Sequence, residues 1–114
     1  PGFWRAGAIG NDFNHQDCLP NLTHRAVDYI NRHAQDERPF FLYLPLPAPH
    51  TPILPTEAFK GKTGLGHYGD FVLMVDDVVG QVREALRRNG IDSNTIVSPK
   101  WQLKGIMPTT SGEA

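Results

Sequence analysis

The chain has 114 residues, of which 39% are hydrophobic and 20% are charged, the composition of one ordinary folded domain. Eleven basic and twelve acidic side chains give a net charge of −1. We expect no nucleic-acid partner, because phosphate contacts need a clear basic excess. We expect no membrane partner either, because the longest apolar run, Phe40–Leu46, is far shorter than the ~20 residues that a bilayer requires.

The localisation stays open. The first residues lack the charged-then-apolar order of a signal peptide, so we expect either a cytoplasmic protein or an export signal outside these residues. The single cysteine, Cys18, cannot form an internal disulfide and does not indicate a redox compartment.

Apolar residues at helical spacing predict a first helix over residues 22–34. Asn21 or Thr23 can cap its start, because both side chains can accept a hydrogen bond from a free backbone N–H group. Asp28 and Arg32 are four residues apart and form a favourable ion pair on such a helix.

A short run, Phe40–Leu44, is apolar at every position and predicts a strand buried inside a parallel sheet. It ends at Pro45, because proline cannot donate a hydrogen bond to a strand ladder. Five prolines within residues 45–55 predict a stiff, extended loop, and His50 lies in its middle. Open α/β sheets bind ligands at the carboxyl ends of their strands, so this loop is expected to carry function.

A glycine-rich turn over residues 61–69 leads into the strongest predicted helix, residues 71–86. Asn89 and Gly90 form a ready C-terminal cap for this helix. Thr95–Val97 then predicts a second buried strand, which Pro99 ends. The predicted fold class is therefore α/β, with a right-handed βαβ unit preceded by a helix.

Three segments imitate known binding motifs. Gly61–Thr63 ends like a phosphate-binding loop, but Thr56 stands where that motif requires glycine. Gly64–Gly69 has the spacing of a dinucleotide fingerprint but lacks the preceding strand, so a turn that opens a helix is favoured. Asp76 and Asp77 could ligate a metal. Adjacent helical residues point about 100° apart, however, so one carboxylate is expected to face solvent or a neighbouring amide.

The order of motifs along residues 4–97 resembles the formylglycine-dependent arylsulfatases, particularly the bacterial ones. Each motif is weak alone, but the ordered series is specific. The segments that carry the resemblance are Gly10–Phe13, Leu19–Thr23, Phe40–Pro45, Ala48–Pro52, the turn Gly64–Asp70, Asp76–Gly80, Gly90–Asp92 and Asn94–Val97, together with Pro55, Phe59 and Leu86.

The resemblance implies a sulfate-ester hydrolase with part of an alkaline-phosphatase-like α/β fold. In that family, the cysteine or serine of a Cys/Ser-x-Pro-Ser-Arg segment becomes formylglycine, whose hydrate attacks sulfur. A calcium ion held by carboxylates and an asparagine polarises the sulfate oxygens. The family histidine that contacts the sulfate maps onto His50, and an imidazole can donate to an anionic oxygen.

The chain departs from the family pattern at the catalytic segments. Cys18–Leu22 imitates the start of the nucleophile segment, but Leu22 stands where arginine is required. An Asp-Asn-Gly segment should follow the second strand, and Ser98–Gln102 stands there instead. We therefore expect residues 1–97 to be an internal segment of a sulfatase catalytic domain and residues 98–114 to be a divergent, loose tail. No catalytic residue, metal ligand, calcium or formylglycine is expected in this chain, which should be inactive alone.

Two alternatives remain open. The chain could be a non-catalytic remnant that binds an anion or associates with itself, or it could derive from a phosphodiesterase or phosphonate hydrolase of the same superfamily. An isolated βαβ unit exposes strand edges and apolar helix faces, so we expect a homo-oligomer that forms through one of these surfaces.

Overall fold

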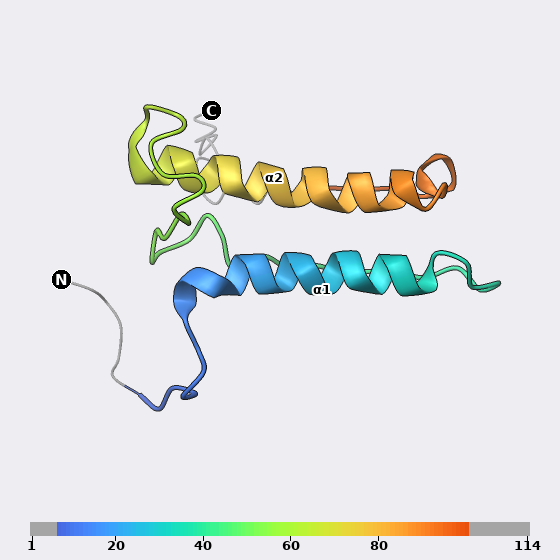
Figure 1. Ribbon diagram of the computed structural model, residues 1–114, viewed down its shortest axis with the longest axis horizontal. Helices are drawn as coiled ribbons and strands as arrows, with labels where there is room; N and C mark the ends of the chain where they lie inside the picture. Colours follow the sequence, from blue (N-terminus) through green and yellow to red (C-terminus); the bar gives the residue numbers. More distant parts are fainter. Residues whose placement is uncertain (1–6, 101–114) are drawn as a thin grey trace, which may run out of the picture.

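A computed structural model describes residues 7–100, which form two long helices that lie side by side and run in the same direction (Figure 1). Helix α1 spans Cys18–His33 and α2 spans Gly66–Arg88. Short 3-10 helices, η1 at His15–Asp17 and η2 at Asp92–Asn94, precede α1 and follow α2. Neither long helix has the length and apolar character needed to cross a membrane.

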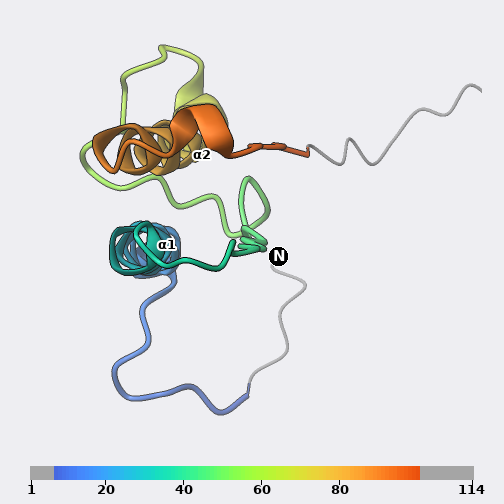
Figure 2. The same ribbon diagram turned by 90° about the vertical axis from the view of Figure 1, so that its right-hand side faces the viewer.

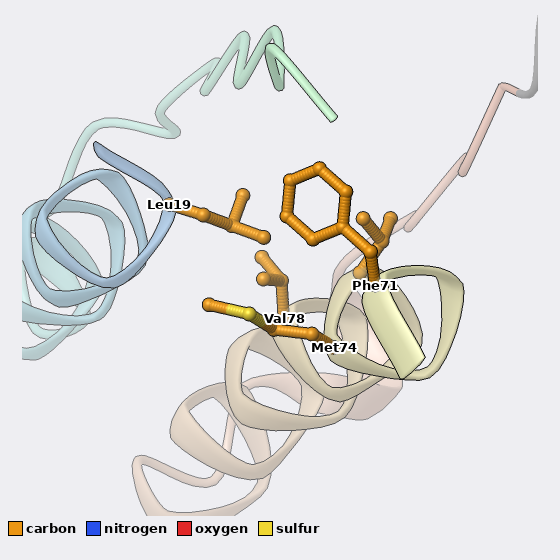
Figure 3. Packing of buried hydrophobic residues seen from close by; sticks show 5 residues of the cluster. Leu19, Phe71, Met74 and Val78 are labelled. Atoms are coloured by element: carbon orange, nitrogen blue, oxygen red, sulfur yellow. The ribbon is translucent and has the colours of Figure 1, made fainter. Parts of the chain in front are cut away.

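Two clusters of buried side chains join α1 to α2. The first cluster joins Leu19, at the start of α1, to the first half of α2 (Figure 3), where it packs with Phe71, Met74, Val75 and Val78. The second cluster joins Ile30, near the end of α1, to Ala85 and Leu86 near the end of α2. Since start meets start and end meets end, the two helices are parallel.

Parallel helices need a return connection, and residues 40–48, called the strap below, provide it. Extended chain rises about 3.3 Å per residue, so these nine residues cover roughly the 24 Å length of the 16-residue α1. Alternate side chains of the strap pack on the two clusters, namely Phe40, Leu42, Leu44, Leu46 and Ala48. Figure 2, which looks along the helices, shows the strap at one side of the pair.

The predicted βαβ unit is wrong for residues 7–100, which contain no strand and no sheet. The segment Phe40–Leu44 is extended as predicted, but only one of its faces is covered, and Phe41 is 88% exposed. The segment Thr95–Val97 is also extended, and Ile96 is 95% exposed. No backbone hydrogen bond joins the two segments. An apolar run favours extended chain, but a strand also needs a neighbouring chain about 4.8 Å away, which this part of the chain does not supply.

Helix α1 begins at residue 18, four residues before the predicted start. The predicted caps, Asn21 and Thr23, therefore lie inside the helix, and the Thr23 hydroxyl donates to the carbonyl oxygen of Leu19 over 2.7 Å. The predicted ion pair is confirmed, with 2.7 Å between Arg32 Nη2 and Asp28 Oδ2.

Helix α2 begins at Gly66, five residues before the predicted start, and its predicted C-terminal cap is confirmed. Gly90 adopts the left-handed conformation, with φ of 69°, immediately after the cap residue Asn89. Its N–H donates to the carbonyl of Arg87 over 3.0 Å, and the N–H of Ile91 donates to the carbonyl of Leu86 over 3.1 Å. This is a Schellman motif, which satisfies two carbonyl groups that the helix end leaves free.

Gly69 of α2 lies against the loop before the helix, and this contact predicts a stability difference. A Cβ atom at Gly69 would lie 2.7 Å from Cβ of Leu65 and 2.9 Å from Oγ1 of Thr63. We expect Gly69→Ala to lower the free energy of unfolding, since overpacking costs about 1–3 kcal/mol and the helix propensity of alanine returns only about 1 kcal/mol.

Gly80 is the matched control, because it lies on the same helix and a methyl group added there would meet no atom within 4 Å. Gly80→Ala should raise the free energy of unfolding by about 0.5–1 kcal/mol. Urea denaturation of both variants measures the difference. Equal stability of the two would contradict the close contact at Gly69.

Candidate functional site

The exposed side chain of His50 lies in the turn that follows the strap. The peptide bonds Ala48–Pro49 and Thr51–Pro52 on either side are cis. The Nδ1 atom of His50 lies 2.8 Å from the carbonyl oxygen of Thr51, and this geometry assigns the Nδ1 proton to that hydrogen bond. The Nε2 atom is then the ring nitrogen left for a ligand.

The turn that carries His50 is anchored to the helix pair on both sides. Ala48 before it and Ile53 after it pack against the first cluster. Further on, Pro55 is buried, and its carbonyl oxygen accepts a hydrogen bond of 3.0 Å from Nε2 of Gln16. An exposed histidine on an anchored turn is typical of a binding position on a rigid scaffold.

A second constellation, which the sequence analysis missed, surrounds Asp70 in the first turns of α2. The side chain is 1% exposed. Its Oδ2 accepts from the N–H of Gly61 over 2.8 Å, and its Oδ1 accepts from the N–H of Thr63 over 3.0 Å and from the Thr63 hydroxyl over 2.7 Å. A signal for it exists in the sequence, because Asp70, Met74 and Val78 share one helical face and Asp70 alone is charged.

The hydrogen bonds around Asp70 also explain why Gly61–Thr63 and Gly64–Gly69 resemble phosphate-binding and dinucleotide-binding motifs without being such sites. The backbone N–H groups of Gly61 and Thr63, which a phosphate-binding loop would offer to its ligand, donate to the Asp70 carboxylate instead. Gly64 and Gly66 have positive φ angles in the turn that opens α2, and no strand precedes them. Both segments therefore serve as turns that lead into the helix.

The hydrogen bonds to Asp70 predict a pH dependence of stability. The N–H groups of Thr63 and Gly61 and the Thr63 hydroxyl hold the pKa of Asp70 below its ordinary value of 3.8, outweighing burial, which raises the pKa. The unfolded chain thus takes up this proton at a higher pH than the folded chain does. The stabilisation is complete above the unfolded pKa and is lost as the pH falls through the lower folded pKa.

We expect Asp70→Asn to have a lower melting temperature than the wild type at pH 7. The difference in melting temperature should become smaller as the pH falls from about 5 to about 2. Thermal unfolding at a series of pH values measures this. Asp76→Asn, at an exposed position on the same helix, is the control and should keep the wild-type profile. A difference in melting temperature between Asp70→Asn and the wild type that is the same at all pH values would contradict the prediction.

The remaining candidate residues do not converge. Asp76 and Asp77 are both exposed on α2, and Asp77 accepts a hydrogen bond of 2.6 Å from the side-chain amide of Gln81. Cys18 is half-buried at the start of α1. Within residues 7–100, no three His, Cys, Asp or Glu side chains gather in a way that could hold a metal ion.

Comparison with known proteins identifies the family. The sulfatase family model matches residues 12–98, which include α1, the strap, His50, Asp70 and α2. The chain belongs to the sulfatase family. This confirms the resemblance to sulfatases, which are hydrolases of sulfuric esters, and the arylsulfatases are among its relatives.

Relatives of this sulfatase chain come from animals and bacteria. It is 39% identical over 75 residues to N-acetylgalactosamine-6-sulfatase of Mus musculus, covering 66% of this chain and 14% of the relative. It is 33% identical over 94 residues to N-acetylgalactosamine-6-O-sulfatase of Bacteroides thetaiotaomicron, covering 82% of this chain and 18% of the relative. Human arylsulfatase D is 43% identical over 70 residues, covering 61% of this chain and 12% of the relative. No solved structure gives a significant match.

Membership of the sulfatase family implies calcium and formylglycine in full-length members. The side chains of residues 7–100 do not fit a calcium site, because their carboxylates do not converge. Nor does the segment around Cys18 fit the nucleophile motif, since Leu22 replaces its arginine. The divergent tail predicted from residue 98 onward lies almost wholly outside the described residues, which end at 100.

Proposed function

We propose that this chain is a segment of the catalytic domain of a sulfatase that hydrolyses a sulfate ester to an alcohol and sulfate, with His50 as its sulfate contact. The observation that carries the proposal is the family match over residues 12–98. The exposed ring of His50, on a turn anchored to the helix pair, supports the assignment of the contact.

The hydrogen bond at Nδ1 supports a specific role for His50 in this proposal. The Thr51 carbonyl oxygen orients the ring and keeps a proton on Nδ1. The imidazolium form of His50 then donates from Nε2 to an anionic sulfate oxygen or to the ester oxygen. Negative charge develops on the ester oxygen as its bond to sulfur breaks, so a donor at this position lowers the energy of the transition state more than that of the bound substrate.

The 114-residue chain alone is proposed to be inactive. Its sequence holds no Cys/Ser-x-Pro-Ser-Arg segment. Electrostatic stabilisation of the transition state requires that the nucleophile and the metal ligands are held together in one site. The test is incubation of the purified chain with 4-nitrophenyl sulfate and calcium. Release of nitrophenol at the buffer rate is expected. Faster release that disappears in His50→Ala would overturn this part of the proposal.

The parent activity is tested through the DNA on both sides of the coding region, translated in all frames. We expect an upstream Cys/Ser-x-Pro-Ser-Arg and a downstream Asp-Asn-Gly in frame with this chain. If neither segment is found, the alternative of a non-catalytic, anion-binding remnant replaces the proposal.

The full reading frame is then expressed and assayed on three esters. Two relatives are named for N-acetylgalactosamine 6-sulfate and one for aryl sulfates, so N-acetylgalactosamine 6-sulfate and 4-nitrophenyl sulfate are the test substrates. Turnover of at least one is expected. 4-Nitrophenyl phosphate is the comparison, because faster phosphate-ester turnover would favour the phosphodiesterase reading instead.

A further inference from the structure

Gln16, in the short helix η1, holds the far end of the turn that carries His50. Its Nε2 atom donates to the carbonyl oxygen of Pro55 over 3.0 Å, although the two residues are 39 positions apart in sequence. Pro55 is buried, and no backbone N–H group of residues 7–100 donates to its carbonyl oxygen. A buried carbonyl group needs a hydrogen-bond donor, and the Gln16 amide supplies it.

The backbone from which Gln16 reaches Pro55 is itself fixed. The N–H group of Gln16 donates to Oδ1 of Asn14 over 3.1 Å, and Nδ2 of Asn14 donates to Oδ2 of Asp17 over 3.0 Å. Helix η1 leads directly into α1, whose residue Leu19 is buried in the first cluster. Figure 1 shows the green turn beside the blue start of α1. The Gln16 side chain therefore connects the turn to the helix pair.

The hydrogen bond adds what the packing of the turn cannot supply. Ala48 and Ile53 pack against the first cluster on either side of His50, but hydrophobic contact has no preferred direction. A hydrogen bond restricts both distance and angle, so it fixes where the Pro55 carbonyl lies. Pro52 and Pro55 have fixed φ angles, which shortens the list of torsions through which His50 could move relative to that carbonyl.

We propose that Gln16 is a positioning residue for His50: its hydrogen bond to Pro55 keeps the turn where Nε2 of His50 meets the sulfate ester. This inference rests on the proposed function of His50 as the sulfate contact. Gln16 does not touch the substrate in this proposal. It acts through geometry, because a misplacement of about 1 Å at a reacting group can cost about 10²-fold in rate.

The test variant is Gln16→Met, which keeps the length and approximate volume of the side chain but has no N–H donor. A role in packing alone would survive this change. Gln35→Met is the matched control, because Nε2 of Gln35 also donates to a distant backbone carbonyl, that of Asn89, 54 positions away over 3.4 Å. Gln35 lies beyond the end of α1, whereas Gln16 lies before its start.

The first measurement is ¹⁵N relaxation in the 114-residue chain, which does not involve ester hydrolysis. The order parameters of the His50, Thr51 and Leu54 amides should be near 0.85 in the wild type, the value of about 0.85 being typical of rigid backbone, and should fall below about 0.6 in Gln16→Met. Gln35→Met should keep the wild-type values at these amides. Unchanged order parameters in Gln16→Met would overturn the proposal.

The second measurement is a double-mutant cycle in the proposed full-length sulfatase, assayed with 4-nitrophenyl sulfate. Gln16→Met should lower kcat/KM by about 10–10²-fold when His50 is present, and Gln35→Met should leave it within about twofold. In a His50→Ala background, Gln16→Met should have no further effect beyond about twofold, because a residue that acts only through His50 has nothing left to position. A loss of the same size in both backgrounds would overturn the proposal, since general destabilisation lowers activity in either background.

The two measurements also separate this inference from the proposed function. If His50→Ala leaves kcat/KM unchanged, His50 is not the sulfate contact, and the catalytic role of Gln16 fails with it. The order parameters still show whether Gln16 holds the turn. If His50→Ala lowers kcat/KM but Gln16→Met does not, the proposed function stands and the positioning role of Gln16 is refuted.

Discussion

Replacing His50 by alanine in the proposed full-length sulfatase is expected to lower kcat/KM for sulfate-ester hydrolysis by about 10²–10³-fold. Removal of a single positioned donor to a developing oxyanion has this effect in other hydrolases. The loss should fall mainly on kcat, because the donor interacts more strongly with the transition state than with the bound ester. Steady-state kinetics with 4-nitrophenyl sulfate provide the measurement.

Two further variants separate a sulfate contact from a structural role of His50. His24→Ala removes a histidine that is exposed on α1, and it should leave kcat/KM within twofold of the wild type. His50→Gln keeps a side-chain N–H donor and should retain more activity than His50→Ala. If His50→Ala and His24→Ala behave alike, His50 does not contact the sulfate.

The largest expected effect on stability belongs to Ile30, which is 1% exposed where α1 meets the end of α2. Ile30→Ala removes three buried carbon atoms and leaves a cavity against Ala85 and Leu86. Such truncations cost about 2–5 kcal/mol. We expect the 114-residue chain to lose a large share of its free energy of unfolding, since small domains are stable by only about 5–15 kcal/mol.

The chain contains a matched control for this prediction, because Ile96 is 95% exposed. Ile96→Ala makes the same chemical change and should alter the free energy of unfolding by no more than about 0.5 kcal/mol. Urea denaturation followed by circular dichroism at 222 nm measures both variants. A similar loss in the two variants would mean that Ile30 is not buried between the helices.

The helices were predictable from sequence because their hydrogen bonds are local. Apolar residues four apart predicted α1 and α2, and the pair Asn89–Gly90 predicted the end of α2 to the residue. The start of α1 was missed because the side chains that pack there, beginning with Leu19, face a partner helix about fifty residues further along the chain.

The absence of a sheet from residues 7–100 was not predictable from sequence in the same way, because a strand depends on which chain lies beside it. The run Phe40–Leu44 correctly indicated extended backbone, but its composition could not show that one face would be uncovered. For the candidate site, the family motif located His50, whereas the anchoring of its turn depends on the distant residue Gln16. The contacts of Asp70 were missed because they come from a loop whose folding no periodicity describes.

The parallel arrangement of α1 and α2 has a consequence for how the chain folds. Two antiparallel helices joined by a short loop can meet as soon as each has formed. Here the side chains of Asn31 and Asn89, which hydrogen-bond over 2.8 Å, are 58 residues apart in sequence. A long loop must therefore close before the core contacts between the helices can form. The conformational entropy of that loop is lost early in folding, before those contacts stabilise the chain. Although the regular structure of residues 7–100 is helical, the chain is expected to fold at a rate closer to that of mixed α/β domains than to that of helical hairpins.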